Sequence, residues 1–183
     1  MTFTKLSWQD LEKDCLELAE QIKQSGIIVD EIISISRGGM VPSRILSDLL
    51  ELPISHIAIQ SYTDLKQTKE PEVTQVSSRQ FKSETILLVD EVSDTGKTYE
   101  RATRYLATLP LHKVYTASPY IKPHTTFVPD FWVKSLDTWI IFPYDIAVTK
   151  KDFTKEFGSL EKAIEKMKEI GFEEWELEVT NRQ

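Results

Sequence analysis

The sequence is poor in cysteine and in long apolar runs. It contains a single cysteine, Cys15, and therefore can form neither an internal disulfide nor a cysteine-based metal cluster. No apolar run approaches the roughly 18 residues needed to cross a bilayer, and no signal-peptide core follows Met1. We therefore expect a protein without membrane contact, located in the cytoplasm.

Positive charge is also in short supply. The 22 Lys and Arg residues are outnumbered by 29 Asp and Glu residues, so the formal net charge is −7. Such a chain is not expected to coat nucleic acid, whose phosphates attract basic surfaces. It can still bind a small anion, because local amides and a few cations suffice for that.

The chain is long and apolar enough for an ordinary globular domain, with 183 residues of which 40% are hydrophobic. Apolar runs and turn signals predict strands over residues 31–36, 53–60, 85–89, 113–118, 131–133 and 139–142. Helical spacing and capping signals predict helices over residues 7–26, 42–50, 98–109 and 159–171. The alternation of strands and helices predicts an α/β fold with a mostly parallel central sheet flanked by helices.

Two segments stand apart from this alternation. Residues 61–82 are polar and contain Pro71, which predicts either a mobile loop or a β-hairpin around Val73 and Val76. The helix over 159–171 is amphipathic, so it either packs on the domain or forms an oligomer contact.

The richest polar segment follows the most apolar predicted strand, where ligands bind in open α/β sheets. Asp90 and Glu91 end this strand and can hold a sugar diol or a hydrated Mg²⁺. Asp94 follows, placed where it could accept a proton. Thr95 and Gly96 then begin a helix whose amides favour a phosphate.

A nucleotide-binding P-loop is excluded here, although Gly96 opens a Gly-Lys-Thr triplet. That motif requires a second glycine five residues earlier. The position is occupied by Glu91, whose carboxylate would repel phosphates.

Residues 87–98 resemble the phosphoribosyl-pyrophosphate (PRPP) motif of the type I phosphoribosyltransferases. That motif consists of four apolar residues, two acids, two mostly apolar residues and Asp-Thr-Gly-x-Thr. The resemblance implies a catalytic base, Asp94, and Mg²⁺ held by Asp90 and Glu91. It implies that PRPP is bound by Asp90, Glu91, Ser93, Asp94, Thr95, Gly96, Lys97 and Thr98.

Residues 35–42 resemble the pyrophosphate loop of the same family, particularly of its xanthine-guanine members. The implied pyrophosphate ligands are Ser36, Arg37, Gly38 and Gly39. Arg37 offers a forked donor to a diphosphate, and the glycines let backbone amides approach it. In this family the loop often contains a cis peptide that does not involve proline.

Two further segments resemble the purine site of the xanthine-guanine enzymes. The resemblance assigns Lys122 to the purine O6, Trp139 to stacking on the ring, and Ile140 and Asp145 to the ring edge. An ammonium group donates and never accepts, which favours a 6-oxopurine over adenine. Tyr144 stands where the family usually has tryptophan.

The resemblance implies the type I phosphoribosyltransferase fold, with a small hood and a flexible loop over 62–80. We expect residues 1–150 to form the phosphoribosyltransferase domain and 151–183 a helical extension packed on it. The flexible loop is expected to act as a lid whose cations are Lys66, Lys69 and Arg79. A homodimer or larger homo-oligomer is expected, as is common in the family.

The implied reaction is purine salvage. A 6-oxopurine (xanthine, guanine or hypoxanthine) and PRPP would form the nucleoside 5′-monophosphate and pyrophosphate with Mg²⁺ as cofactor. One alternative is a pyrimidine or orotate phosphoribosyltransferase, and another is a non-catalytic PRPP-binding regulator. His56, His112 and His124 match no catalytic position of the family, and we expect structural or surface roles for them.

Overall fold

The structure is a computed structural model that describes residues 2–60, 63–64, 67–68, 71–76 and 80–179. The chain separates into two compact units. Residues 11–136 form the larger unit, and residues 1–10 and 137–183 form the smaller one.

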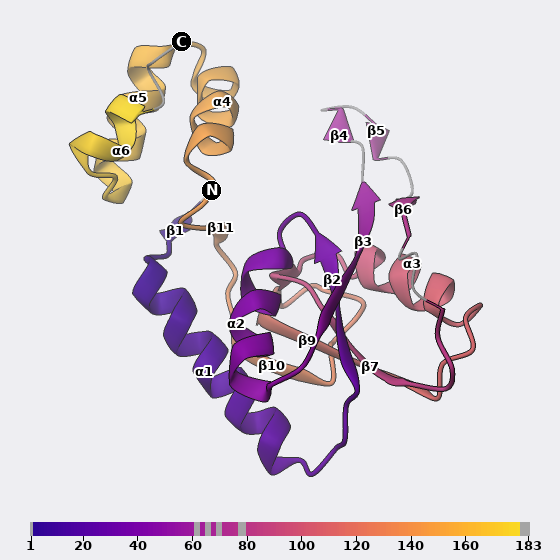
Figure 1. Ribbon diagram of the computed structural model, residues 1–183. Helices are drawn as coiled ribbons and strands as arrows, with labels where there is room; N and C mark the ends of the chain where they lie inside the picture. Colours follow the sequence, from indigo (N-terminus) through magenta and orange to yellow (C-terminus); the bar gives the residue numbers. More distant parts are fainter. Residues whose placement is uncertain (1, 61–62, 65–66, 69–70, 77–79, 180–183) are drawn as a thin grey trace. The chain divides into compact units, whose positions relative to one another are not determined.

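A seven-stranded sheet lies at the centre of the larger unit (Figure 1). Its main order is β10 (Phe131–Ser135), β9 (Lys113–Ile121), β7 (Thr85–Val89), β2 (Glu31–Ser36), β3 (Ile54–Gln60) and β6 (Glu72–Gln75). The short β8 (Val92–Ser93) extends the pairing along β9. All pairs are parallel except that of β3 with β6, so the predicted mostly parallel sheet is confirmed.

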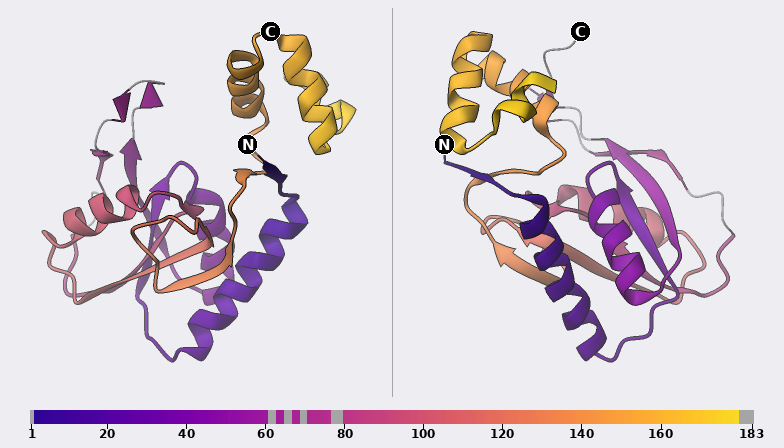
Figure 2. Two further views of the ribbon diagram at one scale, coloured as in Figure 1. Left: turned by 180° about the vertical axis from the view of Figure 1, so that it is seen from behind. Right: turned by 60° about the vertical axis from the view of Figure 1, so that its left-hand side comes forward.

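Helices cover both faces of this sheet, as Figures 1 and 2 show. On one face, α1 (Trp8–Gln24) and α2 (Met40–Leu50) pack on the sheet through Leu18 and Leu46. On the other face, α3 (Lys97–Leu106) packs through Ala102.

Strand β7 explains why the central strands are continuously apolar. Leu87 and Val89 face α1 and α2, whereas Ile86 and Leu88 face α3, and all four side chains are fully buried. A strand covered on both faces has no solvent side for polar residues, so alternation disappears from its sequence.

The polar excursion after β3 is in part an antiparallel strand pair. Strand β6 returns along β3 and places Val73 opposite Ile59, and β4 (Thr63–Asp64) pairs with β5 (Gln67–Thr68). Of the two predicted forms, the described residues therefore adopt strand pairing, and Val76 lies beyond the end of β6. The three predicted lid cations lie outside the described residues: Lys66, Lys69 and Arg79.

In the smaller unit, β1 (Phe3–Lys5) pairs in parallel with β11 (Trp139–Ile141). Three helices follow: α4 (Ile146–Phe157), α5 (Leu160–Ile170) and α6 (Glu174–Val179), drawn from orange to yellow in Figure 2. The apolar core of this unit consists of Ile141, Phe153, Ala163, Met167, Phe172 and Leu177. The predicted helix over 159–171 is confirmed as α5, and the Ser159 hydroxyl accepts a hydrogen bond from the amide of Lys162.

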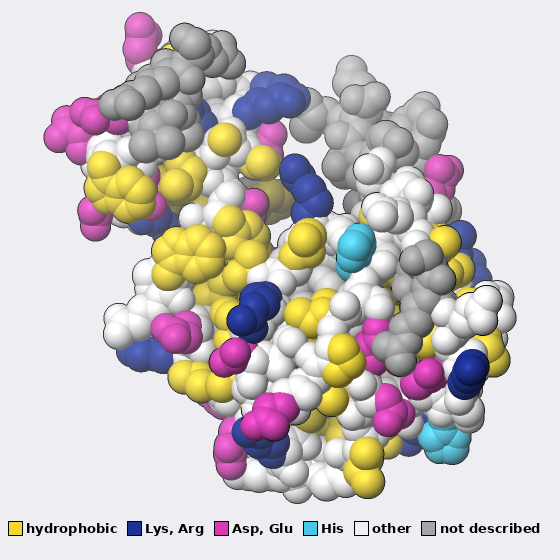
Figure 3. All heavy atoms as spheres, viewed as in Figure 1, with side chains coloured by type: hydrophobic (Ala, Val, Ile, Leu, Met, Phe, Trp, Pro, Cys, Tyr) yellow, Lys and Arg dark blue, Asp and Glu magenta, His cyan; other side chains and the backbone are white. Residues whose placement is uncertain are grey.

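The described surface is mixed in charge. On the face of the larger unit drawn in Figure 3, basic and acidic side chains are interspersed. Within the described part of the chain, no helix is long and apolar enough to cross a membrane.

Candidate functional site

Two polar loops begin side by side at one edge of the central sheet. Strands β2 and β7 are parallel neighbours, with Ser34 paired to Val89, so both chains leave the sheet at the same edge. The loop after β2 contains a cis peptide between Ser36 and Arg37, as the resemblance predicted for this segment. The loop after β7 begins with Asp90.

Glycines allow these two loops to touch. The carboxyl group of Glu91 fills the space that a Cβ atom on Gly38 would occupy. A Cβ atom on Gly39 would lie 2.6 Å from the carbonyl oxygen of Val89 and 2.7 Å from that of Ile35. Gly39 is therefore required by close approach to the main chain, whereas the neighbour of Gly38 is the end of a flexible side chain. The predicted PRPP and pyrophosphate loops lie in contact with each other.

Asp90 is fixed in this site through its backbone. The buried hydroxyl of Tyr99 donates to the carbonyl oxygen of Ala117 and accepts from the amide of Asp90, at 2.8 and 3.0 Å. Burial and, after it, the charge of Asp90 raise the pKa of Tyr99 well above its usual range. Tyr99 therefore stays a neutral hydroxyl that joins α3 to the end of β7 and to the middle of β9.

The acidic pair has the chemistry of a magnesium site. The Asp90 side chain is buried, and its burial, followed by the charge of Glu91, raises its pKa well above the usual range. A cation beside Asp90 would stabilise its ionised form. Mg²⁺ is commonly held by one or two carboxylates while substrate phosphates and water complete its shell. Two adjacent carboxylates are donors of the kind that this arrangement uses. Among the described residues, no group of three or more His, Cys, Asp or Glu side chains could hold a metal ion.

The predicted phosphate loop is held in place by a second segment, residues 122–127. The amide of Lys122 donates to the carbonyl oxygen of Ser93 at 2.9 Å, and the hydroxyl of Thr126 donates to that of Thr95 at 2.8 Å. Gly96 precedes α3 with φ of +88°, and a Cβ atom there would lie 2.5 Å from the amide nitrogen of Phe127. Backbone contact of this closeness tolerates only glycine.

The exposed part of the loop carries the polar groups for a ligand. Asp94, Thr95 and Lys97 are exposed, whereas Ser93 and Gly96 are buried and anchor the loop. At the start of the other loop, the buried hydroxyl of Ser36 has no hydrogen-bond partner within the described structure. The hydroxyls of Ser34 in β2 and Ser43 in α2 also have no partner within the described structure, so this feature does not single out Ser36 as a phosphate ligand.

The four predicted purine contacts are divided between the two units. Lys122 directly follows β9 in the larger unit and is 7% exposed. Trp139 and Ile140 lie on β11 in the smaller unit, and Asp145 precedes α4 there. Tyr144 stacks on Phe142 with ring centroids 5.4 Å apart, which gives this substituted aromatic a structural contact.

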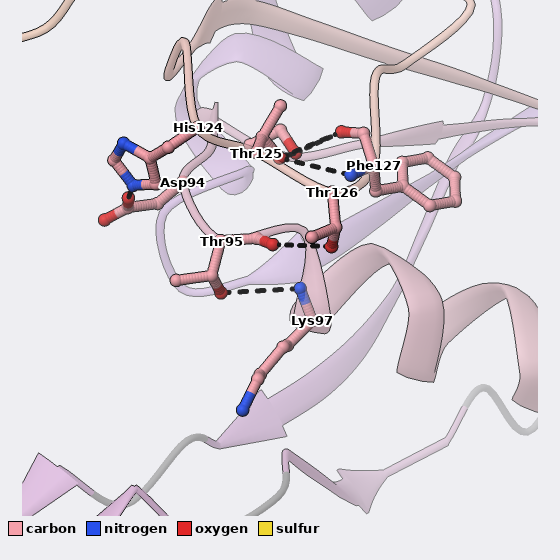
Figure 4. A network of polar contacts seen from close by, with 8 residues as sticks. Asp94, Thr95, Lys97, His124, Thr125, Thr126 and Phe127 are labelled. Carbon is pink, nitrogen blue, oxygen red and sulfur yellow. Dashed lines mark hydrogen bonds and ion pairs between the residues drawn. The ribbon is translucent and has the colours of Figure 1, made fainter.

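Sequence reasoning assigned no site role to His124, yet the structure places it against the predicted base. The Nε2 atom of His124 lies 3.0 Å from Oδ1 of Asp94 (Figure 4). Its position two residues after Lys122 was the available signal, because Lys122 was itself expected at the ligand.

Comparison with known proteins agrees with these motifs. Residues 6–151 match the model of the phosphoribosyl transferase domain family. The xanthine-guanine phosphoribosyltransferase of Desulfotalea psychrophila is 35% identical over 143 residues, covering 76% of this chain and 84% of that protein. The corresponding protein of Nitratidesulfovibrio vulgaris is 31% identical over 146 residues, covering 78% and 85%.

Solved structures show the same fold. A purine phosphoribosyltransferase from Pyrococcus horikoshii has a TM-score of 0.70 and 32% identity, covering 79% of this chain and 95% of that one. A xanthine-guanine-hypoxanthine phosphoribosyltransferase from Helicobacter pylori has a TM-score of 0.69 and covers 82% and 98%; at 24% identity it supports the fold alone. The predicted fold class is confirmed.

Proposed function

Because the chain belongs to the phosphoribosyl transferase domain family, we propose that it transfers the 5-phosphoribosyl group of PRPP to a 6-oxopurine. The products are a nucleoside 5′-monophosphate and pyrophosphate, as in purine salvage. The observation that carries this proposal is the contact of Glu91 with Gly38. This contact brings the groups suited to ribose next to those suited to pyrophosphate. The reaction requires this proximity, because it cleaves the bond between the ribose and the pyrophosphate of PRPP. Xanthine, guanine and hypoxanthine are the candidate bases, and the two relatives named above are xanthine-guanine phosphoribosyltransferases.

Departure of pyrophosphate leaves positive charge on the ribosyl ring. The site must therefore bind the two anionic ends of PRPP, the 5′-phosphate and the pyrophosphate, at separate places. The planar guanidinium group of Arg37 donates hydrogen bonds to the pyrophosphate, and the amides of Gly38 and Gly39 lie beside it. Asp90 and Glu91 accept hydrogen bonds from the ribose hydroxyls. Mg²⁺ held by the same carboxylates would neutralise the diphosphate leaving group.

The exposed loop after the acidic pair supplies the remaining groups. The 5′-phosphate is bound by amides and hydroxyls of residues 93–98, where α3 presents its positive end. Asp94 accepts the proton from purine N7 as N9 attacks C1′. Its side chain is 50% exposed, so the carboxylate is open to an incoming base.

The purine is selected by donors and by stacking. Lys122 donates to the exocyclic O6, which adenine lacks. Trp139 stacks on the ring, its side chain being 48% exposed and therefore available to a ligand. Ile140 through its backbone, together with Asp145, contacts the ring edge, where the three 6-oxopurines differ.

Pyrophosphate release in the presence of PRPP, Mg²⁺ and each purine tests the proposal. The substitution Asp94→Asn keeps the size of the side chain but removes the base, so we expect kcat to fall about 100-fold or more. The KM for PRPP should change little. Near-normal turnover of Asp94→Asn would remove Asp94 as the base.

The same assay separates the two alternatives. Release of pyrophosphate in the assay with orotate, but in none of the assays with a purine, would indicate a pyrimidine phosphoribosyltransferase. Binding of PRPP in calorimetry without release with any base would indicate a regulator.

A further inference from the structure

His124 lies in direct contact with the proposed catalytic base. Its Nε2 atom is 3.0 Å from Oδ1 of Asp94, and the two side chains are 60% and 50% exposed. In Figure 4 the imidazole ring lies beside the carboxylate, on the opposite side of Thr95 from the Lys97 side chain. Only one of the two carboxylate oxygens faces the ring nitrogen.

The backbone on both sides of His124 is anchored to the loop that carries Asp94. Before it, the amide of Lys122 donates to Ser93; after it, the amide of Thr126 donates to the carbonyl oxygen of Thr95 at 3.2 Å. These bonds hold the two segments in register whatever the His124 side chain does. The imidazole is therefore presented to Asp94 by a fixed backbone.

Stability does not account for this contact. Exposed ion pairs contribute little to folding free energy, with a median of about 0–1 kcal/mol. The segment is already secured by main-chain bonds and by the Ser93 hydroxyl, which donates to the carbonyl oxygen of Phe127 at 2.7 Å. Removal of the imidazole should leave the two segments joined.

We propose that His124 is a positioning residue for Asp94, an inference that rests on the proposed function. An N–H on Nε2 donates to Oδ1 and fixes the rotamer of the carboxylate. Oδ2 is then left to receive the proton from purine N7.

The test compares His124→Ala with His124→Gln, because glutamine retains an N–H donor. We expect His124→Ala to lower kcat about tenfold, because a misoriented Asp94 carboxylate loses part of the rate enhancement that a positioned base provides. The KM for PRPP should stay unchanged, and His124→Gln should recover most of the lost kcat. His112→Ala is the matched control, because His112 is exposed at the opposite end of β9.

A double-mutant cycle decides whether His124 acts through Asp94. In the Asp94→Asn background, His124→Ala should cause no further loss of kcat. The positioning role would be overturned if His124→Ala lowered kcat equally in both backgrounds, or if His124→Ala kept the wild-type kcat. In either case an active wild-type enzyme would still support the proposed function. A wild type that releases no pyrophosphate with any purine would overturn both.

Discussion

Gly39→Ala should damage the site by pushing two loops apart. The backbone of Gly39 has φ of −62° and ψ of −12°, which alanine adopts without strain. The cost is therefore steric. The added Cβ would lie 2.6, 2.7 and 2.9 Å from three backbone atoms, those of Val89, Ile35 and Asp90. Two of these atoms are carbonyl oxygens and the third is a Cα atom, and ordinary van der Waals contacts of a Cβ atom lie at 3.4–4 Å.

The magnitude follows from what can move. All three contacted atoms are main-chain atoms at the ends of β2 and β7, whose neighbouring side chains are fully buried. They cannot rotate away as a flexible side chain would, so the loop itself must lift. Overpacking of this kind costs about 1–3 kcal/mol. For a chain of this size, each kcal/mol lowers Tm by about 2–4 °C.

Urea unfolding and the KM for PRPP should be measured on the same preparation. We expect a lower midpoint and a KM raised about tenfold or more, because a lifted loop withdraws the amides beside the pyrophosphate. Gly158→Ala is the control: its φ is +82° with no atom within 4 Å of an added Cβ. That variant should lose stability through backbone strain and keep the KM. Unchanged stability and KM for Gly39→Ala would refute the close-approach argument.

Lys122→Ala should raise the KM for guanine and xanthine about tenfold, because a charge-assisted hydrogen bond is lost, and leave the KM for PRPP unchanged. Unaltered purine kinetics would move base recognition elsewhere. Glu176→Ala should lower the free energy of unfolding by about 1–3 kcal/mol, because the buried Glu176 carboxylate pairs with Lys5 at 2.8 Å and accepts from the amide of Glu173. Lys166→Ala, which breaks the exposed pair with Glu169, should cost at most about 1 kcal/mol in the same urea titration; an equal loss for both would contradict the role of burial.

The predictable parts of the fold are those whose signals are local. The helix predicted to begin at residue 7 has a local capping pair at its start. The Ser7 hydroxyl accepts from the amide of Asp10, and the Asp10 carboxylate accepts from the amide of Ser7. The apolar run 85–89 is strand β7 with the predicted bounds. The helix predicted to reach residue 109 ends at Leu106. In the turn before Pro110, backbone amides bond to the last carbonyl groups of the helix.

The parts that were missed depend on distant partners. The strand β1 has three residues and exists because β11, more than 130 residues away, pairs with it. Helix α4 begins after Asp145, a favoured N-cap residue whose side chain makes no cap hydrogen bond here, and this start signal was not used in the prediction. Helix α6 has six residues, too few for a clear period.

The site divides in the same way. Asp90 to Thr98 form a contiguous motif that the sequence alone displays, whereas Tyr99 and His124 act across the fold. Nothing local to Tyr99 indicates that its hydroxyl bonds to the amide of Asp90 and to the carbonyl oxygen of Ala117 in β9. The expected homo-oligomer, the lid and the dependence on Mg²⁺ stay predictions.

The most direct measurement is a competition for PRPP. Guanine, xanthine, hypoxanthine and adenine are supplied at equal concentration with PRPP and Mg²⁺, and the nucleotides formed are separated by chromatography. The account predicts nucleoside 5′-monophosphates of one or more 6-oxopurines and none of adenine, because Lys122 can only donate. Formation of the adenine nucleotide at a comparable rate, or of no nucleotide at all, would contradict it.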